Sequence, residues 1–144
     1  GKTVQVLSYL LALREQGGNP LPSLIVCPAS LVLNWAEECQ KFTPELNCVV
    51  VDGDAAHRAQ LAEQWDGADV VVTSYDLLRR DETLYESQKF YACILAEAQA
   101  IKNHTTKKYK AVCGVNSRVR FAVEHLLLPD AGLPATLQEL LQPV

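Results

Sequence analysis

Short apolar runs, each about as long as one strand, are the feature that most constrains the fold of this chain. Residues 23–27, 69–73 and 90–95 consist mainly of apolar side chains, and 47–51 and 118–123 are weaker versions of the same pattern. Continuous apolar runs of this length are typical of strands that are buried on both faces of a parallel sheet. They predict a layered structure in which other elements cover the sheet on both sides.

Segments with helical spacing separate and follow these runs. Trp35 lies on the apolar side of one of them, and we expect it in the core rather than in a ligand platform. We expect Ser30, Asp54 and Thr105–Thr106 to act as N-caps. The expected helices are 4–16, 31–42, 54–65, 76–80, 107–112 and 135–141, and 81–89 is either helical or irregular. Strands that alternate with helices predict an α/β fold with a mainly parallel sheet and helices on both faces.

Composition narrows the class of protein. A chain of 144 residues can form one domain with a substantial core, and a net charge of −4 argues against binding polyanions through bulk charge. The five cysteines are scattered without a CxxC pair, which indicates reduced thiols in an intracellular protein. The three histidines lack the spacing of metal ligands. We find neither a run of ~20 apolar residues nor a signal peptide, and therefore expect no membrane contact.

Polar residues follow several of the expected strands or precede a helix. In a parallel sheet the carboxyl ends of the strands meet at one edge, where ligands bind. Gly1-Lys2-Thr3, Ser30, Thr73-Ser74 and Glu97 would all lie at this edge. This convergence is the strongest indication of a site in the sequence.

The tripeptide Gly1-Lys2-Thr3 precedes an apolar helix and could be the end of a phosphate-binding loop. In such a loop the lysine reaches the terminal phosphates, the threonine hydroxyl joins Mg²⁺, and backbone N–H groups surround the anion. The alternative is a chance occurrence, because so short a sequence is common.

The run 90–95 leads into Ala96 and Glu97. A nucleotide-hydrolysing site needs one carboxylate for the metal and a second one for the attacking water. Glu97 could be the second, acting as catalytic base, whereas Ala96 cannot hold a metal. The alternative for Glu97 is a carboxylate at a helix start, which the helix dipole favours.

Basic side chains gather after this motif and at one earlier position. Lysines stand at positions 102, 107, 108 and 110, and Arg79 and Arg80 are adjacent. They could form a solvated surface or contact a nucleic-acid backbone.

Five segments, taken in order, resemble the first RecA-like lobe of Swi/Snf-type DNA-dependent ATPases, which are helicase-like proteins of superfamily two. These segments are GKTVQVLSYLLALRE, SLIVCPASLVLNWAEECQKF, DVVVTSYDLL, ILAEAQAIKN and RVRFA. The resemblance covers most of the chain. It implies an α/β fold with a RecA-like (P-loop) sheet, ATP and Mg²⁺ as cofactors, and double-stranded DNA as partner.

The resemblance also implies roles for individual residues. Gly1, Lys2 and Thr3 would bind the nucleotide, with Thr3 also at the metal, and Glu97 would be catalytic. Ser30, Thr73, Ser74 and Lys102 would contact nucleic acid.

The sequence departs from the family pattern at three places. It begins inside the phosphate loop, and Ala96 stands at the position of the metal-binding aspartate. After Ala122 the family continues with a Thr-Gly-Thr-Pro motif, whereas 124–129 here resembles a segment further downstream. We therefore expect residues 1–144 to be a partial and incomplete lobe, with an internal deletion near 122–123 and without the second RecA-like lobe.

These departures predict a fragment of an ATP-dependent DNA translocase that does not hydrolyse ATP alone. A degenerate relic that acts as an interaction module without nucleotide is the alternative. A third interpretation is an unrelated α/β nucleotide-binding domain. Without the strand that would precede Gly1, we expect an exposed sheet edge, marginal stability and self-association.

Overall fold

A six-stranded sheet with the order β2-β3-β1-β4-β5-β6 organises the chain. The computed structural model describes residues 2–17, 21–98, 106–123 and 141–143. The strands β1 to β5 run parallel, and β6 is antiparallel to β5. Their bounds are β1 (Ser23–Cys27), β2 (Cys48–Val50), β3 (Val70–Ser74), β4 (Phe90–Ala96), β5 (Ser117–Val123) and β6 (Leu141–Pro143).

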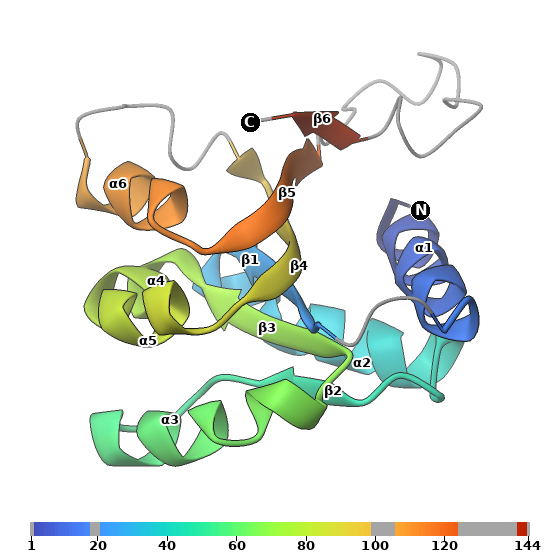
Figure 1. Cartoon of the computed structure of the whole chain (residues 1–144), viewed down its shortest axis with the longest axis horizontal. Coiled ribbons are helices and arrows are strands. Elements are labelled where there is room, and N and C mark those ends of the chain that lie inside the picture. Colours follow the sequence, from blue (N-terminus) through green and yellow to red (C-terminus); the bar gives the residue numbers. More distant parts are fainter. Residues whose placement is uncertain (1, 18–20, 99–105, 124–140, 144) are drawn as a thin grey trace.

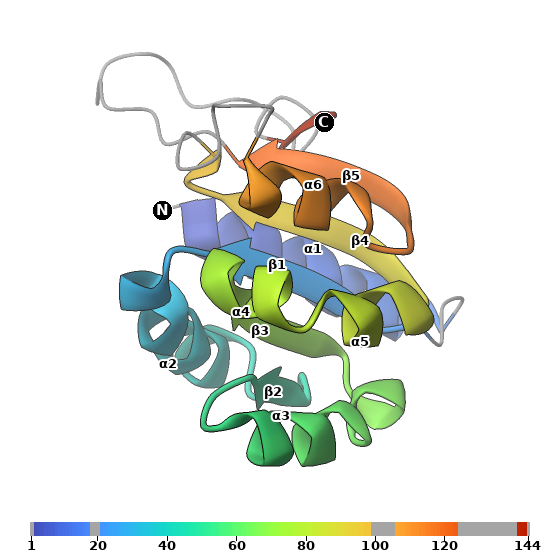
Figure 2. The same ribbon diagram turned by 90° about the vertical axis from the view of Figure 1, so that its left-hand side faces the viewer.

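Helices cover both faces of the sheet (Figure 1). The α-helices are α1 (Lys2–Glu15), α2 (Val32–Phe42), α3 (Ala55–Ala62), α4 (Tyr75–Arg80), α5 (Glu82–Ser87) and α6 (Lys107–Cys113). Single 3₁₀ turns are formed by Ala29–Leu31 (η1) and Trp65–Gly67 (η2). The pair α1 and α2 lies on one face, and α3 to α6 lie on the other (Figures 1 and 2). The predicted mainly parallel α/β architecture is confirmed.

The central strand β1 explains why its sequence is apolar without interruption. Every residue of β1 is buried, because β3 and β4 flank the strand and helices cover both of its faces. Leu24 and Val26 belong to the core under α3 to α6, whereas Ile25 and Cys27 belong to the core under α1 and α2. Each fully buried aliphatic side chain of this size stabilises the fold by roughly 1.5–3 kcal/mol.

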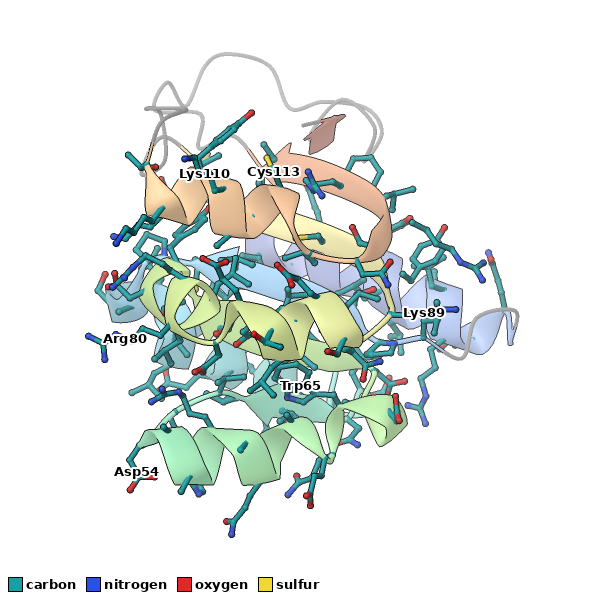
Figure 3. All side chains as sticks on the ribbon, turned by 60° about the vertical axis from the view of Figure 1, so that its left-hand side comes forward. Asp54, Trp65, Arg80, Lys89, Lys110 and Cys113 are labelled. Carbon is teal, nitrogen blue, oxygen red and sulfur yellow. The ribbon has the colours of Figure 1, made fainter. Side chains whose placement is uncertain are left out.

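Aromatic side chains pack together in the core on the side of the sheet that α3 to α6 cover. Trp65 is 1% exposed and lies between the layer of α3 and that of α4 and α5 (Figure 3). Its ring centroid lies 4.8 Å from that of Tyr85 and 5.8 Å from that of Phe90, in tilted geometry. Such aromatic pairs contribute about 0.5–1.5 kcal/mol beyond the area that they bury.

The predicted caps have mixed outcomes. Asp54 Oδ1 accepts the backbone N–H of His57 at 2.8 Å, and Thr106 Oγ1 accepts that of Tyr109 at 3.2 Å. Both caps are confirmed. Ser30, however, is not an N-cap, because η1 begins at Ala29 and places Ser30 inside a helical turn.

Two predicted helices also need correction. The helix expected over 54–65 ends at Ala62, and Trp65 starts the separate turn η2. The helix expected over 135–141 falls mostly outside the described residues, and its last residue, Leu141, begins strand β6. A sixth strand was not predicted, because three residues with one proline carry little strand signal. None of the helices described is long and apolar enough to cross a membrane.

Candidate functional site

Strand β4 brings the predicted catalytic segment to the carboxyl edge of the sheet. It pairs in parallel with β1 on one side and β5 on the other, and Ala96 is its last residue. Glu97 follows at once with a φ of +53°, in the left-handed region. This conformation is uncommon for a residue with a Cβ, and at the end of a buried strand it points to a functional constraint.

A cavity of about 190 Å³ opens where β4 ends. Thr3, at the start of α1, lines this cavity together with Ala96 and Glu97, although more than 90 residues separate them in the sequence. Leu31 and Asn34, from η1 and α2, lie on another side. Trp35 of α2 and Val123 of β5 also line the cavity. We refer to this space as the Thr3–Glu97 cavity.

The Thr3–Glu97 cavity suits an anionic group. Helix α1 begins at Lys2, so the backbone N–H groups of its first turn have no partner within the helix. The positive end of the helix dipole and the Thr3 hydroxyl lie on the same side of the cavity. A volume of about 190 Å³ is below the ~300–1,000 Å³ of typical ligand pockets. The cavity therefore fits the phosphate end of a nucleotide, but not a whole nucleotide.

The lining does not fit a metal ion that the protein itself holds. Among the described residues of the lining, Glu97 alone supplies a carboxylate, and Thr3 supplies a hydroxyl. Ala96 presents a methyl group, and its backbone oxygen already accepts the Tyr75 hydroxyl at 2.9 Å. Within the described part of the chain, no three His, Cys, Asp or Glu side chains are grouped so that they could hold a metal. A hydrolytic Mg²⁺ site needs one carboxylate for the metal in addition to the carboxylate that activates the attacking water, and the position for the former is Ala96.

Tyr75 was not predicted as part of this region. The phenol is 2% exposed, and burial raises its pKa, so the hydroxyl stays protonated and keeps donating to the Ala96 carbonyl. The Tyr75 side chain thereby ties α4 to the end of β4. A tyrosine directly after strand β3 gave no sequence signal beyond a core position.

The structure assigns structural roles to two residues that the resemblance places at nucleic acid. Thr73 is fully buried, and its hydroxyl lies 2.8 Å from the Tyr85 hydroxyl. Ser74 is 3% exposed, and its Oγ accepts the backbone N–H of Leu77 as the cap of α4. Neither side chain offers an exposed surface in this conformation, and their contact with nucleic acid stays a prediction.

The structure describes the remaining predicted site residues only in part. Ser30 is exposed in η1, but it does not line the Thr3–Glu97 cavity. Helix α1 contains Lys2, whose side chain lies outside the described part of the structure. Gly1 and Lys102 also lie outside the described residues.

Basic residues gather where α6 packs beside α4. Lys110 on α6 and Arg80 at the end of α4 point outward in Figure 3 and are exposed. Lys108 instead pairs with Asp76 across the two helices, with Nζ 3.1 Å from Oδ1. The predicted basic cluster therefore divides into exposed positions and one that links two helices.

The comparisons with known proteins agree with this arrangement. The model of the SNF2-related domain matches residues 1–124. The chromatin-remodelling ATPase INO80 of Sclerotinia sclerotiorum is 37% identical over 97% of this chain, and the putative ATP-dependent helicase/translocase YwqA of Bacillus subtilis is 34% identical over 97% of it. The chain spans 8% and 15% of the lengths of these relatives.

A solved structure is similar in fold as well. The Sulfolobus solfataricus SWI2/SNF2 ATPase core in complex with dsDNA superimposes with a TM-score of 0.76 at 34% identity. The match covers 85% of this chain and 25% of that one. The order of the strands, the cavity at their carboxyl edge and the match over residues 1–124 lead to one conclusion: the chain belongs to the SNF2-related domain family.

Proposed function

We propose that this chain is part of the first RecA-like lobe of an ATP-dependent DNA translocase, and that it binds the phosphate end of ATP without hydrolysing it alone. The observation that carries the proposal is the Thr3–Glu97 cavity, where the start of α1 meets the end of β4. The relatives named as chromatin-remodelling ATPase and helicase/translocase support the class of activity.

Phosphate binding follows from the groups that face the cavity. The N–H groups of the first turn of α1 and the Thr3 hydroxyl would donate hydrogen bonds to phosphate oxygens. The resemblance adds Gly1 to the backbone of this site and Lys2 as the cation that reaches the terminal phosphates. In such ATPases Mg²⁺ neutralises charge that develops on the phosphates. The described side chains do not supply its site, so we derive no hydrolytic step for this chain.

The Glu97 carboxylate then opposes nucleotide binding and does not assist ATP hydrolysis. A carboxylate that shares a small cavity with a phosphate repels it when no metal lies between them. Removing this charge should strengthen nucleotide binding, whereas a second carboxylate at position 96 should make binding depend on Mg²⁺.

Titration calorimetry of ATP into the full chain, with and without Mg²⁺, tests this proposal. We expect weak binding that Mg²⁺ changes little, and about fivefold tighter binding in Glu97→Gln, as the loss of ~1 kcal/mol of repulsion requires. Ala96→Asp should weaken binding without Mg²⁺ and strengthen it with Mg²⁺. Thr3→Ala should weaken binding under both conditions, and Thr83→Ala, at an exposed position of α5, serves as the matched control. Tight binding to the wild type that requires Mg²⁺ would contradict the proposed role of Ala96.

Hydrolysis gives a second, separate readout. We expect no ATP turnover above background, with or without duplex DNA, and Ala96→Asp should not restore it because an arginine from a second lobe is also required. DNA-stimulated turnover that disappears in Glu97→Gln would show that Glu97 works as a catalytic base after all.

Double-stranded DNA is the proposed macromolecular partner. The solved SWI2/SNF2 core was in complex with dsDNA, and Ser30, on exposed η1 of this chain, lies in the segment that resembles a DNA-contacting one. Lys102 stays a predicted contact. Fluorescence anisotropy with a labelled duplex should show weak, salt-dependent binding, and binding unchanged between 50 mM and 200 mM salt would exclude phosphate contacts.

The domain organisation is proposed on the same basis. Residues 1–144 would be a partial lobe with an internal deletion near 122–123, and a second RecA-like lobe would be needed to close the nucleotide site. The end of the family match at residue 124, close to this junction, supports the deletion. All five cysteines are free, which supports the proposed intracellular location.

The alternative function is an interaction module that needs no nucleotide. The specific observation in its favour is Ala96, which removes the metal carboxylate from an otherwise well-formed edge of the sheet. The same calorimetry decides between the two functions. No heat from ATP under either condition, with a folded chain, would favour the module.

A further inference from the structure

A hollow of about 560 Å³ lies between helix α2 and the edge strand β2. Ala36 and Gln40 of α2 line one side of it, and Cys48 and Val50 of β2 line the other. None of the described residues lines both this hollow and the Thr3–Glu97 cavity. The proposed nucleotide-binding function therefore makes no use of this place. We refer to it as the α2–β2 groove.

Strand β2 presents unpaired backbone groups beside the α2–β2 groove. It lies at one end of the strand order and pairs only with β3 among the described strands (Figure 1). The N–H of Val51 donates to the Val72 carbonyl of β3 at 2.9 Å. Because successive backbone groups of a strand point to opposite sides, Val49 also faces β3, whereas Cys48 and Val50 face outward. Their N–H and C=O groups form an open edge that another strand can join.

The side chains of β2 alternate between the two cores. Val49 and Val51 belong to the core under α3 to α6, whereas Cys48 and Val50 pack at the border of the core under α1 and α2. Cys48 and Val50 are half-buried, and the groove lies over them. An extended segment alongside β2 would place every second side chain on this same face. The α2–β2 groove would receive those side chains.

Helix α2 adds an apolar side chain beside the groove. Leu33, Ala36 and Gln40 are spaced at i, i+3 and i+7 and therefore share one face of α2. Leu33 is 68% exposed, which is unusual for a large aliphatic side chain in this fold. An exposed leucine next to an open groove offers apolar contact area to a ligand.

Carboxylates flank the groove at both ends of β2. Glu45 precedes the strand and lines the groove, Asp52 follows the strand, and both residues are exposed. Arg14 donates a hydrogen bond to the Glu45 backbone carbonyl, but its guanidinium Nε lies 3.7 Å from the Asp69 carboxylate. Asp52 Oδ1 lies 3.4 Å from His57 Nε2, and both of these side chains are at least half exposed. The ends of the groove therefore favour a ligand that carries cations.

We propose that the α2–β2 groove binds an extended basic peptide of a partner protein, which adds a strand to β2. The backbone groups of Cys48 and Val50 pair with the peptide, and apolar side chains of the peptide enter the groove. Lysines or arginines of the peptide lie near Glu45 and Asp52, where opposite charges fix its register.

A second copy of this chain fits the same edge less well. In an antiparallel pair of two β2 strands centred on Val49, Glu45 of each copy would approach Asp52 and Asp54 of the other. Like charges opposite each other destabilise strand pairing. The net charge of −4 adds to this repulsion.

Fluorescence anisotropy of a labelled peptide added to the full chain tests the proposal. The probe is Arg-Lys-Thr-Val-Thr-Val-Thr-Lys-Arg, in which apolar and polar side chains alternate between basic ends. We expect saturable binding. The same peptide with glutamates in place of its four basic residues should bind at least about tenfold more weakly. A basic peptide with prolines in place of both valines should not bind, because proline cannot donate to a strand edge.

Variants of the chain separate the groove from net charge. Glu45→Lys should weaken binding of the basic peptide by about fivefold or more and strengthen binding of the acidic one. Glu82→Lys makes the same charge change at an exposed position of α5, on the opposite face of the sheet (Figure 2), and should change neither. Leu33→Ala should also weaken binding of the basic peptide. Circular dichroism checks that each variant is folded.

Amide hydrogen exchange measured by NMR locates the bound peptide. The N–H groups of Cys48 and Val50 should exchange more than about tenfold more slowly with saturating peptide. The N–H of Val49, which faces β3, should change little.

Three results would overturn the proposal. The first is equal binding of the basic peptide by Glu45→Lys and the wild type. The second is binding that leaves the exchange of Cys48 and Val50 unchanged. The third is protection of these two N–H groups that appears without peptide and grows with the concentration of the chain, which would identify a second copy as the occupant. None of these results bears on ATP binding, so the proposed function is tested separately.

Discussion

At the scale of single residues, the backbone of Glu97 is strained at the point where strand β4 ends and the candidate site begins. Its φ of +53° puts the Cβ close to its own following carbonyl, which costs roughly 1–2 kcal/mol for residues other than glycine. The surrounding structure must hold this conformation, because β4 is buried up to Ala96 and the chain has to turn away from β5. The site therefore contains stored strain that the sequence pattern did not reveal.

Glu97→Gly should be more stable than Glu97→Ala by about 1 kcal/mol, because glycine adopts positive φ without a Cβ penalty. Urea unfolding of the two variants measures the difference. Since both lack the carboxylate, its contacts cancel in the comparison. The pair Ala98→Gly and wild type is the control, and there glycine should lower the stability. A less stable Glu97→Gly would show that the left-handed backbone carries no strain.

A second residue-scale prediction concerns the buried hydroxyl pair of Thr73 and Tyr85. Tyr85→Phe should lower the free energy of unfolding by about 1–2 kcal/mol, because the Thr73 hydroxyl loses its partner 2.8 Å away while the ring still packs on Trp65. Thr73→Val should cost a similar amount. The double variant should cost less than the sum of the two single ones, and strict additivity would mean that the hydroxyl pair does not stabilise the fold.

At the scale of elements, the first part of strand β5 lies at an open edge of the sheet. β6 pairs only with Phe121–Val123, so no described strand pairs with the outer edge of 117–120. Arg118 is exposed on this segment, and a cation on an edge strand opposes pairing with another chain. The self-association expected from the sequence stays a prediction, and this segment is its proposed location.

Arg118→Val should strengthen self-association by about fivefold, since it removes a charge and adds strand propensity worth ~1 kcal/mol. Sedimentation velocity over a range of concentrations measures the dissociation constant. Arg80→Val, which removes the same charge from an exposed position of α4, should leave association unchanged. Equal effects of both variants would assign the change to net charge instead of the edge.

At the scale of the whole molecule, the sheet has a hydrophobic core on each face, and each core contains a buried cysteine. Because burial keeps both thiols neutral, the stability of the fold should depend on pH. Cys27 and Cys93 lie in the two different cores, and burial raises the pKa of each from 9.0 to about 12. An unfolded chain ionises these thiols near pH 9, before the folded chain does. The stabilisation from these two thiols should therefore not change with pH below pH 9, and it should fall between pH 9 and pH 12.

The expected slope is about 1.4 kcal/mol per pH unit for each thiol in this interval. Urea unfolding at a series of pH values measures it. Cys93→Ala should reduce the slope by the contribution of one thiol, whereas Cys113→Ala, at an exposed position, should not change the slope. The buried Tyr75 and Tyr85, whose pKa values are also raised by burial, add to the loss at the upper end. A slope that is the same in Cys93→Ala would mean that its thiol stays neutral in the unfolded chain as well.

The sequence by itself determined the strands β1 to β5 and the order in which helices separate them. Uninterrupted apolar runs such as 23–27 can only be strands covered on both faces, because every second side chain would otherwise meet water. Asp54 and Thr106 capped helices as predicted, since a cap needs only a side chain and a backbone N–H within one turn. The parallel sheet also fixed which ends of the strands meet, and so placed Thr3 and Glu97 at one edge.

Only the tertiary structure decided what the side chains at this edge can reach. Thr73 and Ser74 turned inward to Tyr85 and to the start of α4, because buried hydroxyls need partners that lie far away in the sequence or on the next turn. Periodicity reports which face of an element is apolar, whereas contacts between elements depend on packing that no local pattern encodes.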